Sequence, residues 1–352
     1  MVRAPAWVGG LALALAATPA LAQTPATTSV TVSARGQTAP VGTANDDAAD
    51  DPAIWRNAAR PSASLIVATD KKQGLYVYGL GGEVKNFTAA GRVNNVALVD
   101  LGRRGVIVVA SDRNDVAAAK LQLYRLDTKR GTLAPLGAVD GGAGEAYGVC
   151  LLQVRRELHA FSVLKHGAIH HIALELAGQQ PVARPLRVLR LDTQTEGCVA
   201  DSRSATLYVG EEDRGIWAFD ARASGSTVPR LVAPVDGQHL VADVEGLALW
   251  PQGRRGGWLV ASSQGDNAYA LYRLPDFTPG GRFRIGAGAF GATEETDGIE
   301  LAPGSFGRDY PAGLFIAQDG DNAPAAQNFK LVSWRDIRRA VAQSARERRS
   351  AP

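Results

Sequence analysis

The chain has 352 residues, with 38 Lys and Arg against 35 Asp and Glu and a formal net charge of +3. This charge is unevenly placed, because the stretch from Arg335 onward carries six arginines and only two acidic residues. With that stretch and Arg3 set aside, the rest of the chain has a net charge of about −2, which excludes a general nucleic-acid-binding surface.

The first 22 residues have the features of a secretory signal peptide. Arg3 provides the charged start, residues 8–17 form an apolar core, and Ala20-Leu21-Ala22 is a small-x-small cleavage site. We therefore expect an exported protein, periplasmic or extracellular. No other apolar run approaches the roughly 20 residues that cross a bilayer, so no membrane span is expected in the mature chain. We also expect the protein to be a monomer.

Three segments follow the predicted signal peptide. Residues 23–45 form an N-terminal segment, and its strand SVTVSAR at 29–35 could close a ring by joining the last repeat. Residues 46–340 are predicted to be a single domain. Residues 341–352 are expected to form a basic, flexible tail, and Ser333 with Asp336 three residues later resembles the N-cap of a C-terminal helix.

Six weakly similar segments recur at intervals of about 50 residues. Each begins an apolar strand with polar residues, and the anchors are Asp51, Asn95, Tyr147, Glu196, Glu245 and Asp297. Each anchor segment is followed by an apolar strand, a polar turn and another apolar strand, as in SLIVATDKKQGLYVYGL. Propeller blades repeat every 40–50 residues or so. The sequence therefore predicts an all-β fold, a six-bladed β-propeller.

Propeller topology brings charged residues of every blade to one rim. The strand after each anchor strand returns to the face where the anchor strand begins, so the next turn lies beside the anchors. Tyr147 lies at this predicted rim with nine carboxylates and four bases. The carboxylates are Asp50, Asp51, Glu196, Glu211, Glu212, Asp243, Glu245, Asp297 and Asp319, and the bases are Lys71, Lys72, Arg113 and Lys165.

The segment ADVEGLALW shows what this rim requires. Asp243 and Glu245 lie two residues apart, which places both on one face of an extended chain, where their charges repel. A flexible set of oxygen ligands suits Ca²⁺ better than Mg²⁺. Cations beside a cradle of Lys and Arg indicate metal-assisted phosphoryl hydrolysis. Any single acid could be a solvated turn residue, but unrelated turns would not recur at equivalent positions in six repeats.

Other motifs are less informative. Cys150 and Cys198 could form a disulfide in an exported protein, or remain two buried thiols, and their spacing does not decide between these states. The histidines show no metal-ligand spacing. The chain contains no Walker loop, no Gly-x-Ser-x-Gly elbow and no Cys/His zinc pattern.

Several segments together resemble one known family, the β-propeller phytases. They are DAADDPAIW, DKKQGLYVY, QTEGCVADSRSATLYVGEEDRGIW, DVEGLALW, SSQGDNAYALY, TDGIEL and GLFIAQDG with NFKLVSW, and they run in order from about residue 48 to residue 334. The resemblance implies a six-bladed, calcium-dependent phosphoric monoester hydrolase of the 3-phytase type. Its substrate would be the calcium complex of myo-inositol hexakisphosphate (phytate).

The resemblance also implies roles for individual residues. The catalytic calcium ions would be held by Tyr147, Glu196, Glu212, Asp243, Glu245 and Asp297. Catalysis would further use Lys71, Arg113 and Lys165, which bind substrate phosphates with Lys72 close by. A stabilising calcium would be held by Asp51 with the carbonyls of Pro52 and Val96, and the turn Gln318-Asp319 resembles part of another calcium site.

Two rival functions remain at this stage. A calcium-dependent propeller lactonase would need one central calcium and few cations, and the Lys/Arg cradle argues against it. A non-catalytic module could bind phosphorylated ligands without hydrolysing them. For the hydrolase we expect direct attack by water, with Lys71, Arg113 and Lys165 on exposed turns stabilising the charge on the phosphoryl oxygens.

Overall fold

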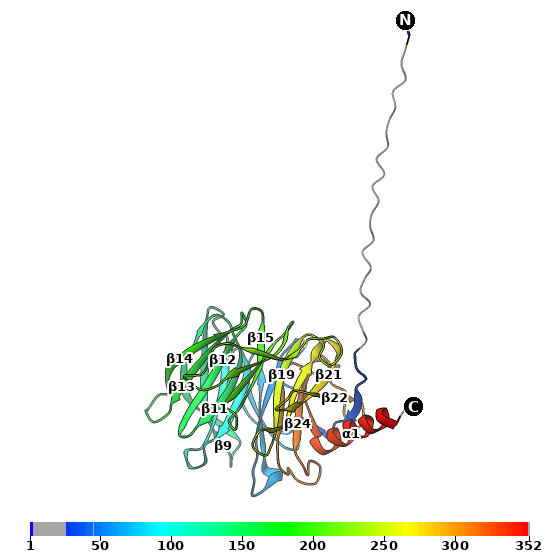
Figure 1. Cartoon of the computed structure of the whole chain (residues 1–352). Coiled ribbons are helices and arrows are strands. Elements are labelled where there is room, and N and C mark those ends of the chain that lie inside the picture. Colours follow the sequence, from blue (N-terminus) through cyan, green and yellow to red (C-terminus); the bar gives the residue numbers. More distant parts are fainter. Residues whose placement is uncertain (3–25, 45, 351–352) are drawn as a thin grey trace.

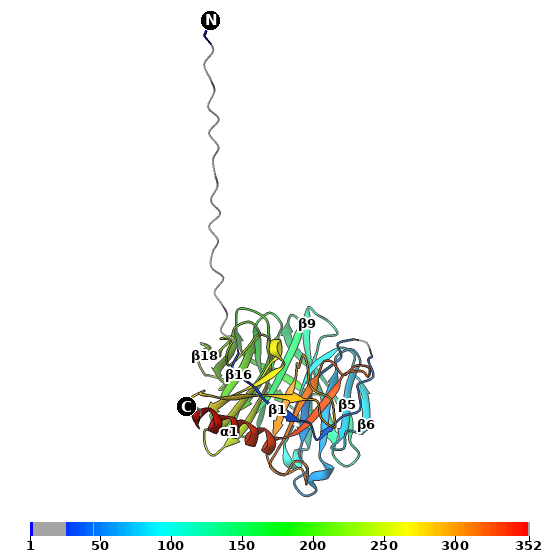
Figure 2. The ribbon, with the colours of Figure 1, turned by 90° about the vertical axis from the view of Figure 1, so that its right-hand side faces the viewer.

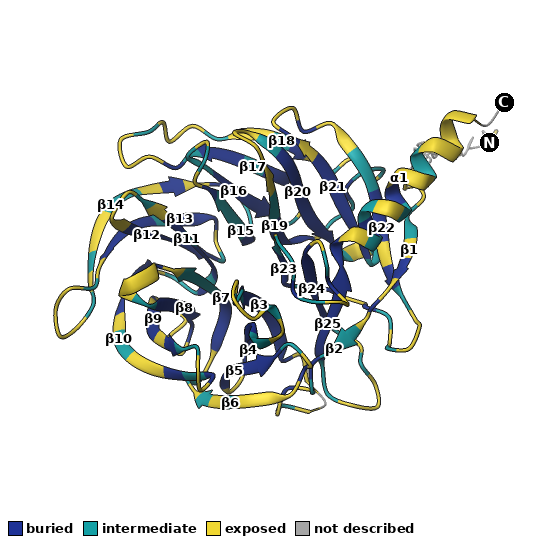
Figure 3. Ribbon diagram, turned by 90° about the horizontal axis from the view of Figure 1, so that it is seen from below, coloured by how far each residue is buried: buried dark blue, intermediate teal, exposed yellow. Residues whose placement is uncertain are grey.

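The computed structural model describes residues 1–2, 26–44 and 46–350, so the predicted signal peptide lies almost wholly outside the described residues. The described chain forms six sheets of four or five strands. These sheets are arranged as blades around a common centre (Figures 1 and 3). The predicted six-bladed β-propeller is confirmed.

Each blade begins with its innermost strand and proceeds outward. Blade 1 contains β3 (Ala49–Trp55), β4 (Leu65–Asp70), β5 (Gly74–Gly79) and β6 (Val84–Ala89), and blade 2 contains β7 (Val93–Asp100), β8 (Val106–Asp112), β9 (Ala118–Asp127) and β10 (Thr132–Ala143). Blade 3 contains β11 (Ala146–Val154), β12 (Glu157–Leu164), β13 (Ala168–Glu175) and β14 (Val182–Arg190), and blade 4 contains β15 (Thr195–Asp201), β16 (Thr206–Glu211), β17 (Gly215–Asp220) and β18 (Arg230–Pro234).

The last two blades also take strands from the N-terminal segment. Blade 5 contains β19 (Val244–Gln252), β20 (Gly256–Ser263), β21 (Ala268–Leu274), β22 (Pro279–Gly286) and β1 (Val30–Ser33), and blade 6 contains β23 (Ile299–Ala302), β24 (Leu314–Asp319), β25 (Asn328–Ser333) and β2 (Gly36–Gln37). Short 3₁₀ turns lie at Pro61–Ala63, Gly102–Arg104 and Gln264–Asp266.

Ring closure differs from the expectation. The strand β1 pairs in parallel with β22 of blade 5, not with the last blade, and β2 supplies the outermost strand of blade 6. The N-terminal segment therefore links two blades: β1 adds a fifth strand to blade 5, and β2 completes blade 6. The reason is geometric: Ala34 and Arg35 follow β1, and the chain then crosses to β25 with Arg35 donating its backbone N–H to Leu331.

The anchors share a backbone irregularity as well as a position. In five of the six innermost strands the pairing register shifts at the anchor, for example between Thr195 and Cys198 and between Val244 and Leu247. A bulge places two residues opposite one and re-aims their side chains. These bulges lie at the rim ends of the strands. The side chains of Glu196 and Glu245 therefore do not follow the regular alternation between the two faces of a strand.

Glycines after four anchors let neighbouring blades approach closely. A Cβ added to Gly197 would lie 2.1 Å from the carbonyl oxygen of Glu245, and one added to Gly298 would lie 2.4 Å from that of Asp50. The backbone N–H of Gly298 donates to the same Asp50 oxygen at 3.0 Å. Only glycine permits this contact, so the Asp-Gly and Glu-Gly pairs of the sequence are where the ring packs at its centre.

The C-terminal helix α1 (Trp334–Ser350) lies against the outside of the ring (Figures 1 and 2). Trp334, Ile337 and Val341 are buried in one hydrophobic cluster with residues of β1 and β22. The predicted tail is thus helical through Ser350, and of its residues Val341 belongs to the apolar stripe that docks the helix. Ser333 is not its cap, since the hydroxyl of Ser333 has no hydrogen-bond partner within the described residues. No helix in the described parts of the chain is long and apolar enough to cross a membrane.

The two cysteines form a disulfide between adjacent blades. Cys150 on β11 and Cys198 on β15 are bonded, with their Cα atoms 5.9 Å apart. The bond joins two innermost strands just below Tyr147 and Glu196, and so it fixes the spacing of blades 3 and 4 near the rim. The alternative of two free thiols is wrong.

Removing this cross-link should destabilise the protein measurably. The two cysteines are 48 residues apart, and loop-closure entropy for a loop of that length corresponds to about 4 kcal/mol. At roughly 2 °C per kcal/mol for a chain of this size, the variant Cys150→Ser/Cys198→Ser should melt roughly 8 °C lower. Reduced wild-type protein should show a similar shift, and equal melting of all three samples would contradict the prediction.

Candidate metal and phosphate site

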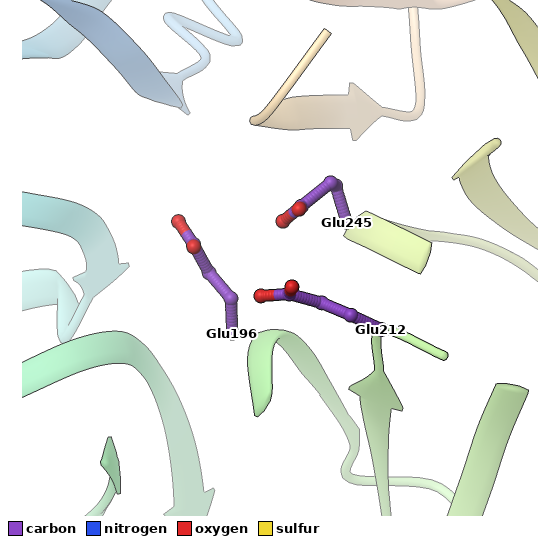
Figure 4. Close-up of side chains that lie close together, drawn as sticks. All are labelled: Glu196, Glu212 and Glu245. Carbon is purple, nitrogen blue, oxygen red and sulfur yellow. The ribbon is translucent and has the colours of Figure 1, made fainter. Parts of the chain in front are cut away.

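Three glutamates from two blades meet at the rim. Glu196 on β15, Glu212 after β16 and Glu245 on β19 each present a carboxylate oxygen, and these oxygens all lie within 4.8 Å of one another. Figure 4 shows the three side chains pointing toward a common centre. We call this set the glutamate triad. The bulges of β15 and β19 supply two of its members, and the β16–β17 turn supplies the third.

The triad carries charge that nothing in the described residues fully compensates. Glu212 Oε1 and Glu245 Oε2 are buried without a hydrogen-bond partner within the described chain. Burial raises the pKa of Glu196 and of Glu245 well above its usual range, and neighbouring carboxylates add to the shift. An all-oxygen set with orphaned buried oxygens fits a hard cation such as Ca²⁺.

Lys71 lies between three carboxylates next to the triad. Its ammonium group is 2.8 Å from both Asp47 and Asp297 and 3.2 Å from Asp50. Burial works against its charge, but these carboxylates outweigh burial and raise the pKa of Lys71. The expectation of an exposed turn is wrong here, since Lys71 is only 7% exposed. Lys72 is more open and pairs with Asp46 at 3.2 Å.

Arg113, Tyr147 and Lys165 form a second group at the rim. The Arg113 guanidinium lies 5.4 Å and the Lys165 ammonium 4.9 Å from the centre of the Tyr147 ring. Arg113 is 9% exposed, contrary to the expected exposed turn, and its nearest acid is Glu145 at 3.6 Å. Its Nε atom has no partner within the described residues. Two cations thus flank the phenol, and a hydrogen bond to Tyr147 raises the pKa of Lys165.

Asp243 and Glu245 do not lie as an equivalent pair. The strand β19 begins at Val244, so Asp243 precedes it and is exposed, whereas Glu245 is buried. Strict alternation therefore does not apply at this position, and Asp243 is not part of the triad. The two charges still interact, because Asp243 contributes to the raised pKa of Glu245. Asp297 contributes more than Asp243 to the raised pKa of Glu245, and burial raises the pKa of Asp297 itself to about 7.

Asp51 points into the central channel below the rim. The channel has a volume of about 200 Å³ here, and its lining includes Asp51, Val96 and Glu300. Asp51 Oδ2 accepts the backbone N–H of Val96 at 3.0 Å. Burial raises the pKa of Asp51 well above its usual range, and burial raises that of Glu300 to about 7. The channel therefore holds a second pair of carboxylates, of which sequence reasoning identified only Asp51.

The turn Gln318-Asp319 is already occupied by protein groups. Asp319 Oδ2 lies 2.8 Å from the fully buried ammonium of Lys330, which also donates to Asn322 and Asn328. Gln318 bridges the ring, since its amide oxygen accepts the backbone N–H of Asp297 at 2.9 Å and its amide nitrogen donates to the carbonyl of Ala49 at 3.1 Å. A lysine ammonium thus satisfies the Asp319 oxygen that faces it.

Sequence reasoning assigned no role to three groups that contact the site. Asn94 is buried and donates to Glu196 Oε1 at 2.7 Å, and Gln264 donates to Asp297 Oδ1 at 2.7 Å. Asp47 contacts Lys71, as described above. The Asn-Asn pair within an apolar strand could have indicated Asn94. Nothing in the local sequence distinguishes Gln264 or Asp47 from ordinary turn residues.

Comparisons with known proteins agree with this architecture. The sequence model of the family described as Phytase matches residues 4–347. The chain is 36% identical over 324 residues to the 3-phytase of Bacillus subtilis (strain 168), covering 87% of this chain and 84% of that protein. Among solved structures, a chain in the crystal structure of the mitotic checkpoint complex has a TM-score of 0.51 at 15% identity, over 90% of this chain and 85% of that one.

The structural likeness shows the propeller fold alone, because the sequences are so different. The family match spans nearly the whole described propeller, and the curated relative is similar over most of both chains. Together with an acidic rim beside a cluster of Lys and Arg, these findings place the protein: the chain belongs to the phytase family of β-propeller phosphoric monoester hydrolases.

Proposed function

We propose that the protein is an exported, calcium-dependent phytase that hydrolyses phosphomonoesters of myo-inositol hexakisphosphate as its calcium complex. The observation that carries the proposal is the glutamate triad, with two orphaned buried carboxylate oxygens beside the cations of the rim. The similarity to a 3-phytase supports the substrate. The leader-like first 22 residues of the sequence support export.

In this proposal the carboxylates of the rim hold calcium. The proposed ligands are Tyr147, Glu196, Glu212, Asp243, Glu245 and Asp297, with a stabilising ion at Asp51, Pro52 and Val96. The expected further site at Gln318 and Asp319 is left out of the proposal, because Lys330 and the backbone N–H of Glu294 bind the Asp319 carboxylate and both ends of the Gln318 amide are hydrogen-bonded within the protein. The chemistry that calcium supplies when bound is a lowered pKa for a coordinated water and partial neutralisation of the phosphate charge. Asn94 and Gln264 fix the orientation of two of the carboxylates by hydrogen bonds.

The cations of the rim bind the substrate phosphates. Arg113 and Lys165 flank Tyr147, so both are positioned to contact oxygens of one phosphoryl group. Arg113 has an unused Nε donor and only a long ion pair to Glu145. Lys71 shares Asp297 with the proposed metal ligands, which links phosphate binding to metal binding. These residues stabilise negative charge that develops on the phosphoryl oxygens.

Replacing Arg113 by Ala should impair catalysis far more than folding. We expect phytate hydrolysis to fall on the order of 10²-fold, as for the loss of one transition-state donor. Arg113 is buried, so its removal loses the 3.6 Å ion pair to Glu145 and also relieves the desolvation cost of a charge whose Nε has no partner within the described residues. These two effects oppose each other, so the melting temperature should change by only a few degrees, at roughly 2 °C per kcal/mol of net change. A folded Arg113→Ala protein with wild-type kinetics would remove this residue from the site.

Phosphate release from phytate by the purified protein tests the proposed function. With calcium present, we expect stoichiometric release of inorganic phosphate over several turnovers. Tight binding of phytate without release would favour a non-catalytic module. Hydrolysis of a lactone with no release of phosphate would favour the propeller lactonase, although the cluster of rim cations argues against that activity.

A further inference from the structure

A second cationic site lies on the outside of the ring, between α1 and the edge of blade 5. Two adjoining hollows, of about 620 and 230 Å³, share Trp258, Arg273, Gly280 and Arg349 in their lining. We call them together the helix groove. Five arginines line it, namely Arg273, Arg338, Arg346, Arg348 and Arg349, against a single carboxylate, Asp276.

The helix groove is remote from the glutamate triad. Arg273 lies near the end of β21, opposite Trp258 near the start of β20, and the rim end of this strand pair is at Ala268 and Ser263. The helix starts after Ser333, which pairs with Leu314, the first residue of β24. Asp319 is at the opposite end of β24, the end that lies at the rim. The groove therefore lies at the end of blade 5 opposite the rim, and no residue assigned to the rim lines it. Figure 3 shows α1 outside β22 and β1.

Aromatic packing holds two of the guanidinium groups in place. Arg338 lies 4.3 Å and Arg273 5.6 Å from the centre of the Trp258 ring, and Arg338 also lies 5.8 Å from that of Trp334. Such contacts orient a guanidinium while leaving its N–H groups free. Trp258 is itself buried, and a Cβ on Gly280 would lie 2.1 Å from its ring. The platform under the two arginines is therefore rigid.

The guanidinium groups have no acidic partners. Among the described residues, neither Arg273 nor Arg338 makes an ion pair with a carboxylate, and the same holds for Arg346 and Arg349. Burial and the proximity of Arg273 lower the pKa of Arg338, and a bound anion would offset the repulsion between the two guanidinium groups. Guanidinium groups bind phosphate oxygens through paired N–H donors. Five of them around two adjoining hollows would favour a ligand of high negative charge density.

We propose that the helix groove is a second binding site for a compact polyphosphorylated molecule, of the class of the inositol polyphosphates. Its volume lies within the roughly 300–1,000 Å³ of small-molecule sites. A membrane surface fits less well, because the apolar residues Trp334, Ile337 and Val341 of α1 face the propeller and cannot enter a bilayer. The ligand class is that of the proposed substrate, and in this respect the inference rests on the proposed function.

The test measures binding without turnover, so that it can fail independently of catalysis. Phytate is titrated calorimetrically into the Arg113→Ala protein in excess chelator, a background that weakens binding at the rim. The groove variant adds Arg273→Gln and Arg338→Gln. The matched control adds Arg308→Gln and Arg335→Gln, which remove the same charge from exposed positions outside the groove lining.

We expect the control to keep the affinity of the background and the groove variant to lose about tenfold for each guanidinium removed. Because Arg338 packs against Trp258 and Trp334, its loss could loosen the helix. A second groove variant, Arg346→Gln/Arg349→Gln, changes only exposed side chains and should also weaken binding. Unchanged affinity in both groove variants, or equal losses in the control, would overturn the proposal. If the protein sedimented with phosphatidylglycerol vesicles and did not bind phytate, the proposal would also be overturned, in favour of a membrane contact.

Discussion

The Glu245→Gln protein should fold in calcium and lose at least about 100-fold of its phytate hydrolysis. Glu245 is buried in the triad, and its Oε2 has no partner within the described residues. Glutamine keeps the size of the side chain but removes a charge that the proposed cation requires. Added calcium should therefore restore little activity. The measurement is phosphate release during a calcium titration of the variant and of wild type.

A matched control separates this effect from a general change at the rim. Glu295 is an exposed glutamate on the neighbouring turn, outside the triad, and Glu295→Gln should keep wild-type rates at every calcium concentration. If Glu245→Gln matched wild type at equal calcium, the triad would be structural and the chemistry would lie elsewhere. If instead the variant were more stable and fully active, relief of charge repulsion would be the whole effect.

Removing calcium should destabilise the protein, and the effect should grow with pH. Without a bound cation, burial raises the pKa of Asp297 to about 7 and raises those of Glu196 and Glu245 well above their usual range. The unfolded chain has carboxyl pKa values of about 4. Between about pH 4 and 7 the folded protein in chelator thus binds more protons than the unfolded chain, so its stability falls as pH rises through this window.

Calcium should reverse this dependence, since its ligands must be deprotonated to bind it. The melting temperature in calcium minus that in chelator should therefore be small at pH 5 and large at pH 8. Activity in calcium should likewise fall in acid. Thermal melts at both pH values, with and without chelator, provide the test. A difference that shrinks toward pH 8 would contradict the assignment of these carboxylates to a metal.

The repeat and the rim could be predicted because they depend on periodicity. Anchors at intervals of about 50 residues indicated the blades, and strand direction alone placed Glu196, Glu212 and Glu245 on one face. Alternation within a strand failed at Asp243, because each anchor lies at the start of its strand and most lie in a bulge. Backbone irregularities of this kind leave no periodic signal in the sequence.

Contacts between distant segments were beyond prediction for a different reason. The pairing of β1 with blade 5 joins segments about 250 residues apart, and the Lys330–Asp319 ion pair depends on how blade 6 packs. Lys71 is buried because carboxylates of its own blade and of the neighbouring blade 6 surround it, and Arg113 is buried because the Tyr147 ring covers it. Turn composition alone suggested exposure for both.

The most direct test of the central claim is phosphate release from phytate by the wild-type protein at neutral pH, from excess chelator to saturating calcium. The account predicts no release in chelator and full, reversible recovery as calcium is added, because two buried oxygens of the triad have no hydrogen-bond partner within the described residues. Equal release of phosphate in chelator and in calcium would contradict it.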